Sequence, residues 1–158
     1  MDERTYGVAD PATRSSEDGL TFLLGMLNGQ RPHPPICRTL GFHLAEVSEG
    51  QAVFEGMPRI EHYNPIGTVH AGFAATLLDS ALACAIWSTV GREEAWTTLE
   101  IKLNFVRPMT HETGTVRADA KVLHRGATMA TSQADLKDLR GRLIAHGTTT
   151  CMIIPPKA

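Results

Sequence analysis

The feature that most constrains this chain is a 22-residue apolar segment, Val69–Val90, whose only formal charge is Asp79. An ionised carboxylate without a partner in a dry interior costs several kcal/mol, which is comparable to the whole stability of a domain. We therefore expect Asp79 to be paired, to face a cavity, or to be retained for its function.

The length of this segment would suit a membrane span, but its composition does not. Ala, Ser and Thr are frequent in it, and an aspartate at the centre of a span costs about 2.5–3.5 kcal/mol. We predict instead one long buried helix from about His70 to Val90, stopped by Gly91, and no membrane partner. Because this helix is apolar all round, it must be covered on every side.

The rest of the chain predicts strands around the helix. Two short runs, 42–48 and 51–57, are separated by Glu49-Gly50 and are typical of a hairpin. Four further strands are expected after the helix, at about 96–106, 114–124, 127–138 and 142–154. The fold class is therefore α+β: a curved antiparallel sheet wrapped around one long central helix, with another element covering the open side.

The first part of the chain is expected to lie outside this core. Residues 1–16 predict a loose polar arm without a secretory signal, and residues 17–158 predict a single domain. A helix of two to three turns is expected after a cap at Ser15 or Ser16. The proline-rich stretch 30–36 predicts a loop.

Charge and cysteine content narrow the functional classes. The net charge is −2 and the basic residues are dispersed, which argues against a nucleic-acid partner. The three cysteines, Cys37, Cys84 and Cys151, form no C-x-x-C pair and indicate reduced thiols in the cytoplasm. The seven histidines form no cluster with metal-ligand spacing, so no metal or other cofactor is expected.

The loop in front of the long helix carries residues suited to carbonyl chemistry. Asn64-Pro and Gly67 predict a tight turn that leads into the helix. The first helical residues, Ala71 and Gly72, then present free backbone N–H groups, which can stabilise an oxyanion. Asp79 follows in the third turn, too deep to cap the helix. The segment thus combines an amide, oxyanion donors and a carboxylate, which together can activate a carbonyl and attack it.

Residues 64–79, NPIGTVHAGFAATLLD, resemble the N-x-x-G-x-x-H-G-G-x-x-x-x-L-x-D signature of the hot-dog fold acyl-CoA thioesterases, in particular the PaaI-like group. The resemblance covers about residues 40–154 and implies an enzyme that hydrolyses an acyl-CoA thioester. It implies that Asp79 is the nucleophile or the general base and that the Ala71 N–H polarises the thioester carbonyl. Ala71 stands where the signature has its first glycine, and it keeps the backbone donor.

The same resemblance implies supporting roles. Asn64 is expected to hold the acyl group or the water, and His70 to order the loop and the helix start. A strand hydroxyl is expected to assist Asp79: the resemblance favours Thr98, whereas strict alternation places Thr97 on the apolar face of the strand. The region that meets the nucleotide end of CoA in the family corresponds to Arg125, Gly126 and Thr128.

The helix geometry predicts a dimer. Ala71 and Asp79 are separated by about 12 Å along one helix, whereas both must act within about 3 Å of one carbonyl. Two antiparallel helices across a two-fold axis satisfy this requirement and also cover the open side of the sheet. The resemblance likewise implies a homodimer with shared sites, which in some members pairs into a tetramer.

Two other functions fit the same fold. Hot-dog hydratases or dehydratases of acyl-CoA or acyl carrier protein carry D-x-N-P-x-H, but here His62 stands in the place of that aspartate. A non-catalytic acyl-CoA-binding protein is the second alternative, since a fold does not fix a function. Aryl, short and medium acyl groups all agree with these residues.

Overall fold

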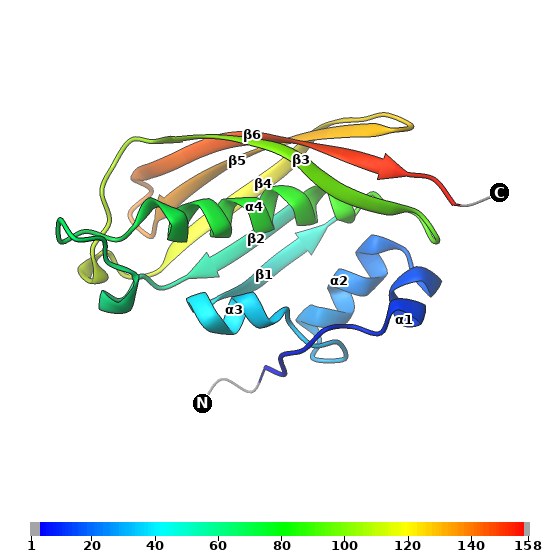
Figure 1. Ribbon diagram of the computed structural model, residues 1–158, viewed down its shortest axis with the longest axis horizontal. Helices are drawn as coiled ribbons and strands as arrows, with labels where there is room; N and C mark the ends of the chain where they lie inside the picture. Colours follow the sequence, from blue (N-terminus) through cyan, green and yellow to red (C-terminus); the bar gives the residue numbers. More distant parts are fainter. Residues whose placement is uncertain (1–3, 157–158) are drawn as a thin grey trace.

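The computed structural model describes residues 4–156, and its main feature is one long helix, α4 (Ala71–Trp87), that lies along a six-stranded sheet (Figure 1). The strands are β1 (Phe42–Ser48), β2 (Gln51–Gly56), β3 (Ala95–Phe105), β4 (Val116–Arg125), β5 (Met129–Asp138) and β6 (Leu143–Ile154). All neighbouring strands are antiparallel. This is the α+β arrangement that the sequence predicts. Within the described range, no helix is long and apolar enough to cross a membrane.

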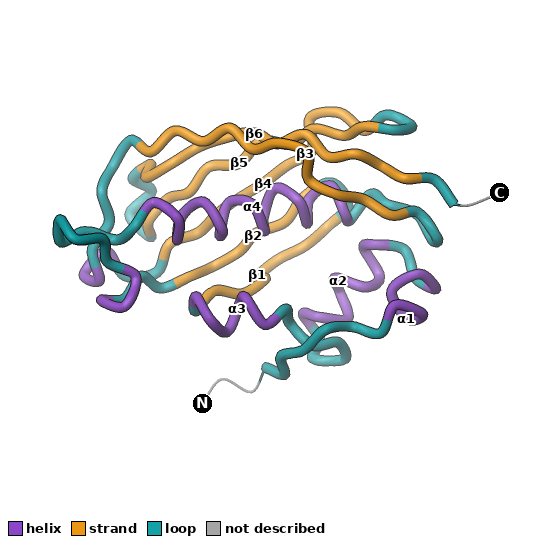
Figure 2. The backbone as a smooth tube through the Cα atoms, viewed as in Figure 1, coloured by secondary structure: helices purple, strands orange, loops and turns teal. Residues whose placement is uncertain are grey.

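The strand order is β1-β2-β4-β5-β6-β3, so β1 and β3 form the two edges of the sheet. The tube in Figure 2 shows β2 and β4 passing behind α4, with β6 and β3 along its upper side. β1 and β2 turn at Glu49-Gly50 as expected, and Gly50 adopts the positive φ of 74° that this turn needs. The Gly50 N–H donates to Ser88 Oγ at 2.8 Å, which ties the hairpin to the end of α4.

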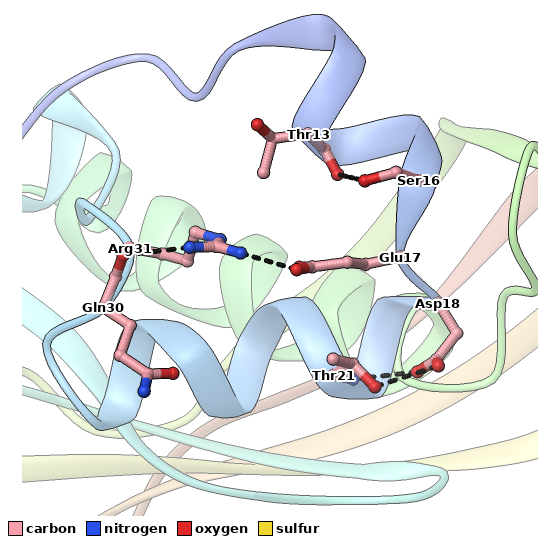
Figure 3. Close-up of polar contacts among 7 residues, drawn as sticks. All are labelled: Thr13, Ser16, Glu17, Asp18, Thr21, Gln30 and Arg31. Atoms are coloured by element: carbon pink, nitrogen blue, oxygen red, sulfur yellow. Dashed lines mark hydrogen bonds and ion pairs between the residues drawn. The ribbon is translucent and has the colours of Figure 1, made fainter.

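The helix expected near residue 16 begins later than predicted. It is α2 (Gly19–Leu27), and its N-cap is Asp18 rather than Ser15 or Ser16. The Asp18 carboxylate accepts from the N–H and the hydroxyl of Thr21 at 2.8 and 2.9 Å (Figure 3). An ionised cap satisfies two donors of the first turn at once, and this explains the later start.

The arm predicted to be loose has structure. Its last residues form a short helix, α1 (Pro11–Ser16), which Asp10 caps by accepting from the Ala12 N–H at 2.8 Å. Glu17, just after α1, pairs with Arg31 at 2.5 Å and so connects the segments that precede and follow α2 (Figure 3). Earlier in the arm, the Gly7 N–H donates to the His33 carbonyl at 2.9 Å.

A third short helix, α3 (Pro35–Leu40), begins within the loop predicted at 30–36 and takes its last two residues. Pro35 occupies the first helical position, where the missing N–H would have had no partner in any case. Gly41 ends the helix with φ 69°. α2 and α3 both pack against β1, so this edge of the sheet is covered.

One face of α4 is left uncovered in the single chain. Its half-buried residues recur every three or four positions: Gly72, Ala75, Thr76, Asp79, Ser80, Cys84 and Trp87. The positions between them, such as Leu78 and Leu82, are fully buried. The helix expected to be covered on every side is therefore open along this stripe, which contains Asp79.

Candidate active site

His70 holds the start of α4. It is the N-cap, and its Nδ1 accepts a hydrogen bond from the Gly72 N–H at 2.8 Å. The Gly72 N–H was expected to be a free donor, and this expectation was wrong because His70 accepts from it. The Ala71 N–H, in contrast, has no acceptor among residues 4–156. Ala71 is exposed, and its N–H is thus available to an incoming carbonyl.

Gly72 has a steric reason to be glycine. A Cβ at this position would lie 2.8 Å from His70 Nδ1, closer than non-bonded atoms approach each other. The glycine therefore allows the imidazole to cap the helix. His70 orders the helix start through this contact, which is consistent with the role that the resemblance implied.

Asn64 shapes the loop in front of the helix. Its Oδ1 accepts from the N–H groups of Ile66 and Thr68 at 3.1 and 3.3 Å, and its Nδ2 donates to Thr68 Oγ1 at 3.0 Å. The backbone of Asn64 also donates to the Thr68 carbonyl at 2.8 Å. The amide is thus engaged within its own loop. A role in holding the acyl group or the water stays a prediction.

His62 fixes the same loop, although sequence reasoning assigned it no role. Its carbonyl accepts from the His70 N–H at 2.7 Å, and its ring stacks on Phe73 with 4.6 Å between centroids. Burial, and secondly the charge of Arg59, lowers the pKa of His62. The neutral ring accepts from the Arg59 N–H at Nδ1. No spacing in the sequence marks this contact, because it depends on how the loop folds back onto α4.

The loop is also tied to the connection between β3 and β4. The Val69 N–H donates to the Met109 carbonyl at 2.9 Å, and the Tyr63 hydroxyl accepts from the His111 N–H at 3.0 Å. These bonds hold the chain just before the Ala71 donor, so the donor is presented by a fixed backbone.

Asp79 lies half-buried on the open stripe of α4. Its Oδ1 is buried and has no hydrogen-bond partner within the described chain. Burial raises the pKa of the Asp79 carboxyl, and the nearby Thr98 hydroxyl offsets this rise only in part. No described residue forms an ion pair with Asp79. Of the explanations for a lone carboxylate, pairing with a cation is therefore excluded within residues 4–156.

A β-bulge decides which threonine accompanies Asp79. Thr98 pairs with Cys151 and Glu100 with Thr150, so Leu99 is an extra residue in β3. Thr98 therefore shares the helix-facing side with Ile101, which pairs with the buried Thr149. Strict alternation across the bulge was the wrong assumption.

The CoA-nucleotide residues predicted by resemblance lie at the turn between β4 and β5. The Arg125 guanidinium pairs with Glu94 at 2.9 Å and also donates to the Gly126 carbonyl. The Gly126 N–H donates to the Met129 carbonyl, and the Thr128 carbonyl accepts from the Ile153 N–H. Both terminal nitrogens of Arg125 are thus engaged within the chain, and a role of this residue toward CoA stays a prediction.

The sequence profile of the thioesterase superfamily matches residues 66–145, just over half of the chain. Acyl-coenzyme A thioesterase 13 of Homo sapiens is 32% identical over 115 residues, which cover 72% of this chain and 81% of the human protein. The range matched by the profile includes the last residues of the loop before α4, the helix itself and four of the six strands in whole or in part.

Solved structures share the fold. A phenylacetic acid degradation-related protein from Ralstonia eutropha superposes with a TM-score of 0.75 at 28% identity, covering 83% of this chain and 98% of that one. The Escherichia coli PaaI protein from the phenylacetic acid degradation operon gives a TM-score of 0.75 at 21% identity, covering 88% of this chain and 95% of that one. Together with the matched profile and the similarity to an acyl-CoA thioesterase, this shows that the chain belongs to the thioesterase superfamily and has its hot-dog fold.

Proposed function

We propose that the protein hydrolyses an acyl-CoA thioester to the free acid and CoA, with Asp79 as the nucleophile or as the general base. The observation that carries this proposal is the half-buried carboxylate of Asp79, which has no cation beside it, lies next to the Thr98 hydroxyl and opens to the uncovered side of α4. The human relative, which is named as an acyl-CoA thioesterase, supports the substrate class.

Two chemical routes use the same residues. As a base, Asp79 takes a proton from water while the water oxygen bonds to the thioester carbon. As a nucleophile, its oxygen bonds to that carbon directly and water then hydrolyses the anhydride. In both routes the Ala71 N–H stabilises the oxyanion, the carbon–sulfur bond breaks, and the CoA thiolate takes up a proton.

The site is proposed to be complete only in a homodimer. Ala71 and Asp79 lie at the first and the third turn of one straight helix, about 12 Å apart, so they reach one carbonyl only from different chains. The uncovered stripe of α4 leaves room for this arrangement. His70 and Asn64 of one chain would then shape the carbonyl side of a site whose Asp79 and Thr98 come from the other.

The two edges of the sheet support a dimer of this kind. β1 packs against α2 and α3, whereas β3 is bonded only to β6 among residues 4–156 and exposes apolar side chains, with Leu99 57%, Ile101 37% and Phe105 48% accessible. A long apolar edge strand without a cover is a surface on which a second strand can pair. We propose that a second copy of β3 occupies it.

The substrate class is tested by measuring thiol release from a panel of aryl-acetyl, short-chain and medium-chain CoA esters. We expect turnover of at least one ester by the wild-type protein. Hydration of an enoyl-CoA without thiol release would instead identify a hydratase. Binding of acyl-CoA with no turnover by a folded protein would identify a binding protein, and either result would overturn the proposal.

Shared sites are tested by mixing two inactive variants. Asp79→Asn removes the carboxylate, and Asn64→Ala releases the loop that leads to the Ala71 donor. A heterodimer then has one site with both lesions and one site with neither. Random exchange should restore about a quarter of wild-type activity, since about half of the dimers are mixed and each has one intact site. Exchange demonstrated by native mass spectrometry without any regained activity would place each site within one chain.

A further inference from the structure

Cys151 faces Thr98 across the β3–β6 ladder, and the chemistry proposed above makes no use of it. The two residues are a cross-strand pair directly before the bulge at Leu99. Thr98 Oγ1 lies 3.8 Å from Cys151 Sγ, within reach of a hydrogen bond that involves sulfur. Cys151 has no accessible surface in the single chain, so water does not compete for this contact.

The number of available protons sets the direction of this bond. An ionised Asp79 can only accept, so a Thr98 hydroxyl that binds it must donate its single proton to the carboxylate. The Thr98 oxygen is then left as an acceptor, and the Cys151 thiol, on which the Thr149 hydroxyl also acts, is the buried donor within reach. Burial raises the pKa of the Cys151 thiol, so it retains its proton at neutral pH.

We propose that Cys151 is a positioning residue, whose thiol donates to Thr98 Oγ1 and thereby turns the Thr98 proton toward Asp79. This rests on the proposed function in one respect, that Asp79 is the reacting carboxylate. The bulge at Leu99 makes the arrangement possible, because it places Thr98 and Cys151 together on the side of the sheet that faces α4. The other titratable groups that act on these side chains, Cys84 on α4 and Glu100 on β3, are left unchanged in the test below.

The test compares two variants that lack the donor, Cys151→Ala and Cys151→Val, with Cys151→Ser, which keeps one. In the first two we expect kcat to fall by about two- to tenfold at unchanged KM, the effect of one ordinary hydrogen bond. We also expect the acid limb of the kcat/KM profile to move to higher pH, because a freely rotating Thr98 hydroxyl stabilises the carboxylate less. Cys151→Ser should lie closer to the wild-type protein on both measures.

The matched control is Cys37→Ala, which removes another buried thiol, on α3. It should lower the Tm without moving the acid limb. A second control combines Cys151→Ala with Thr98→Val: if Cys151 acts through Thr98, the double variant should behave as Thr98→Val alone. Additive losses, or an acid limb that stays in place in both donor-free variants, would show that Cys151 only fills space.

A measurement without substrate separates this inference from the proposed function. The Asp79 carboxyl can be titrated by difference infrared spectroscopy, with Asp79→Asn as the blank. We expect its midpoint to rise in Cys151→Ala and Cys151→Val. A wild-type protein that hydrolyses no thioester would refute the proposed function and leave this titration intact, whereas an unchanged midpoint in both variants would refute the positioning role alone.

Discussion

Leu78 and Asp79 are adjacent in α4, and the turn of about 100° between consecutive helical residues places them on different faces. Leu78 is 0% exposed and packs into the core between the helix and the sheet. Asp79 lies on the stripe of half-buried small and polar residues, which stays partly open among the residues that the structure describes. One face of the helix thus contributes to folding, and the other holds a carboxylate in a setting unfavourable to its charge. The comparison teaches that α4 combines stability and chemistry by separating them around its axis.

The largest effect is expected from Asp79→Asn, which keeps the shape of the open face and removes its charge. Hydrolysis should fall by about 10²–10⁴, the usual contribution of a positioned base or nucleophile. Steady-state kinetics with circular dichroism as the control for folding would measure this. If Asp79→Asn instead unfolded most of the protein and the remaining folded molecules turned over normally, Asp79 would have a structural role, as Leu78 does.

On the buried face, Leu78→Ala should lower the stability of the protein and leave its turnover nearly unchanged. Truncating a fully buried leucine costs about 2–5 kcal/mol of unfolding free energy, because it removes buried surface and leaves a cavity. Urea denaturation measures this loss, and kinetics below the unfolding transition should show near-normal kcat per folded molecule. A deep loss of kcat in a fully folded Leu78→Ala protein would contradict the separation of the two faces.

A smaller difference is expected between two neighbouring threonines. Thr98→Val should reduce kcat by about ten- to a hundredfold, since a hydrogen bond to a charged group contributes about 1.5–3 kcal/mol. Thr97→Val is the matched control, because Thr97 lies on the other side of the strand before the bulge. Equal defects in the two variants, measured at saturating substrate, would mean that the bulge does not select the hydroxyl.

The smallest effect concerns pH and stability. Burial raises the pKa of the Asp79 carboxyl above its ordinary value of 3.8, so the folded protein binds this proton more tightly than the unfolded chain. The resulting stability is fully present below the unfolded pKa and is lost as the pH rises through the folded one. Asp79→Asn should therefore gain stability relative to the wild-type protein between pH 4 and pH 7, as measured by urea denaturation at both values. If the difference in unfolding free energy between the variant and the wild-type protein were the same at both pH values, burial would not penalise the carboxylate.

Most of the fold could be predicted because it follows from periodicity. The hairpin around Glu49-Gly50, the long helix and the four later strands lie within a few residues of their predicted positions. The short helices α1 and α3 were missed, since a helix of six residues depends on caps and neighbours more than on its own pattern. The Asp10 cap of α1 illustrates this, because it is a single side-chain contact, with the Ala12 N–H.

The sequence also identified residues that the structure places around α4, but it did not predict their contacts. Asn64, Ala71 and Asp79 were found from the pattern of the loop and the helix, and His70 from the resemblance to the hot-dog thioesterases. That His70 occupies the Gly72 donor, that Asn64 is engaged within its loop and that Arg125 is paired with Glu94 depend on how side chains fold back on the chain. Such hydrogen bonds and ion pairs depend on the positions of side chains to within a few ångströms. The spacing of residues along the sequence does not specify these positions.

By itself, the sequence determined that one long apolar helix carries a lone carboxylate, and the resemblance to the hot-dog thioesterases implied a strand hydroxyl near it. Only the tertiary structure decided which hydroxyl. Alternation along β3 counts residues as if the strand were regular, whereas the ladder with β6 accommodates Leu99 as an extra residue and reverses the faces beyond it. Because side chains alternate with a period of two, one inserted residue is enough to exchange the two sides of a strand, and the partner strand rather than the strand's own sequence sets where that happens.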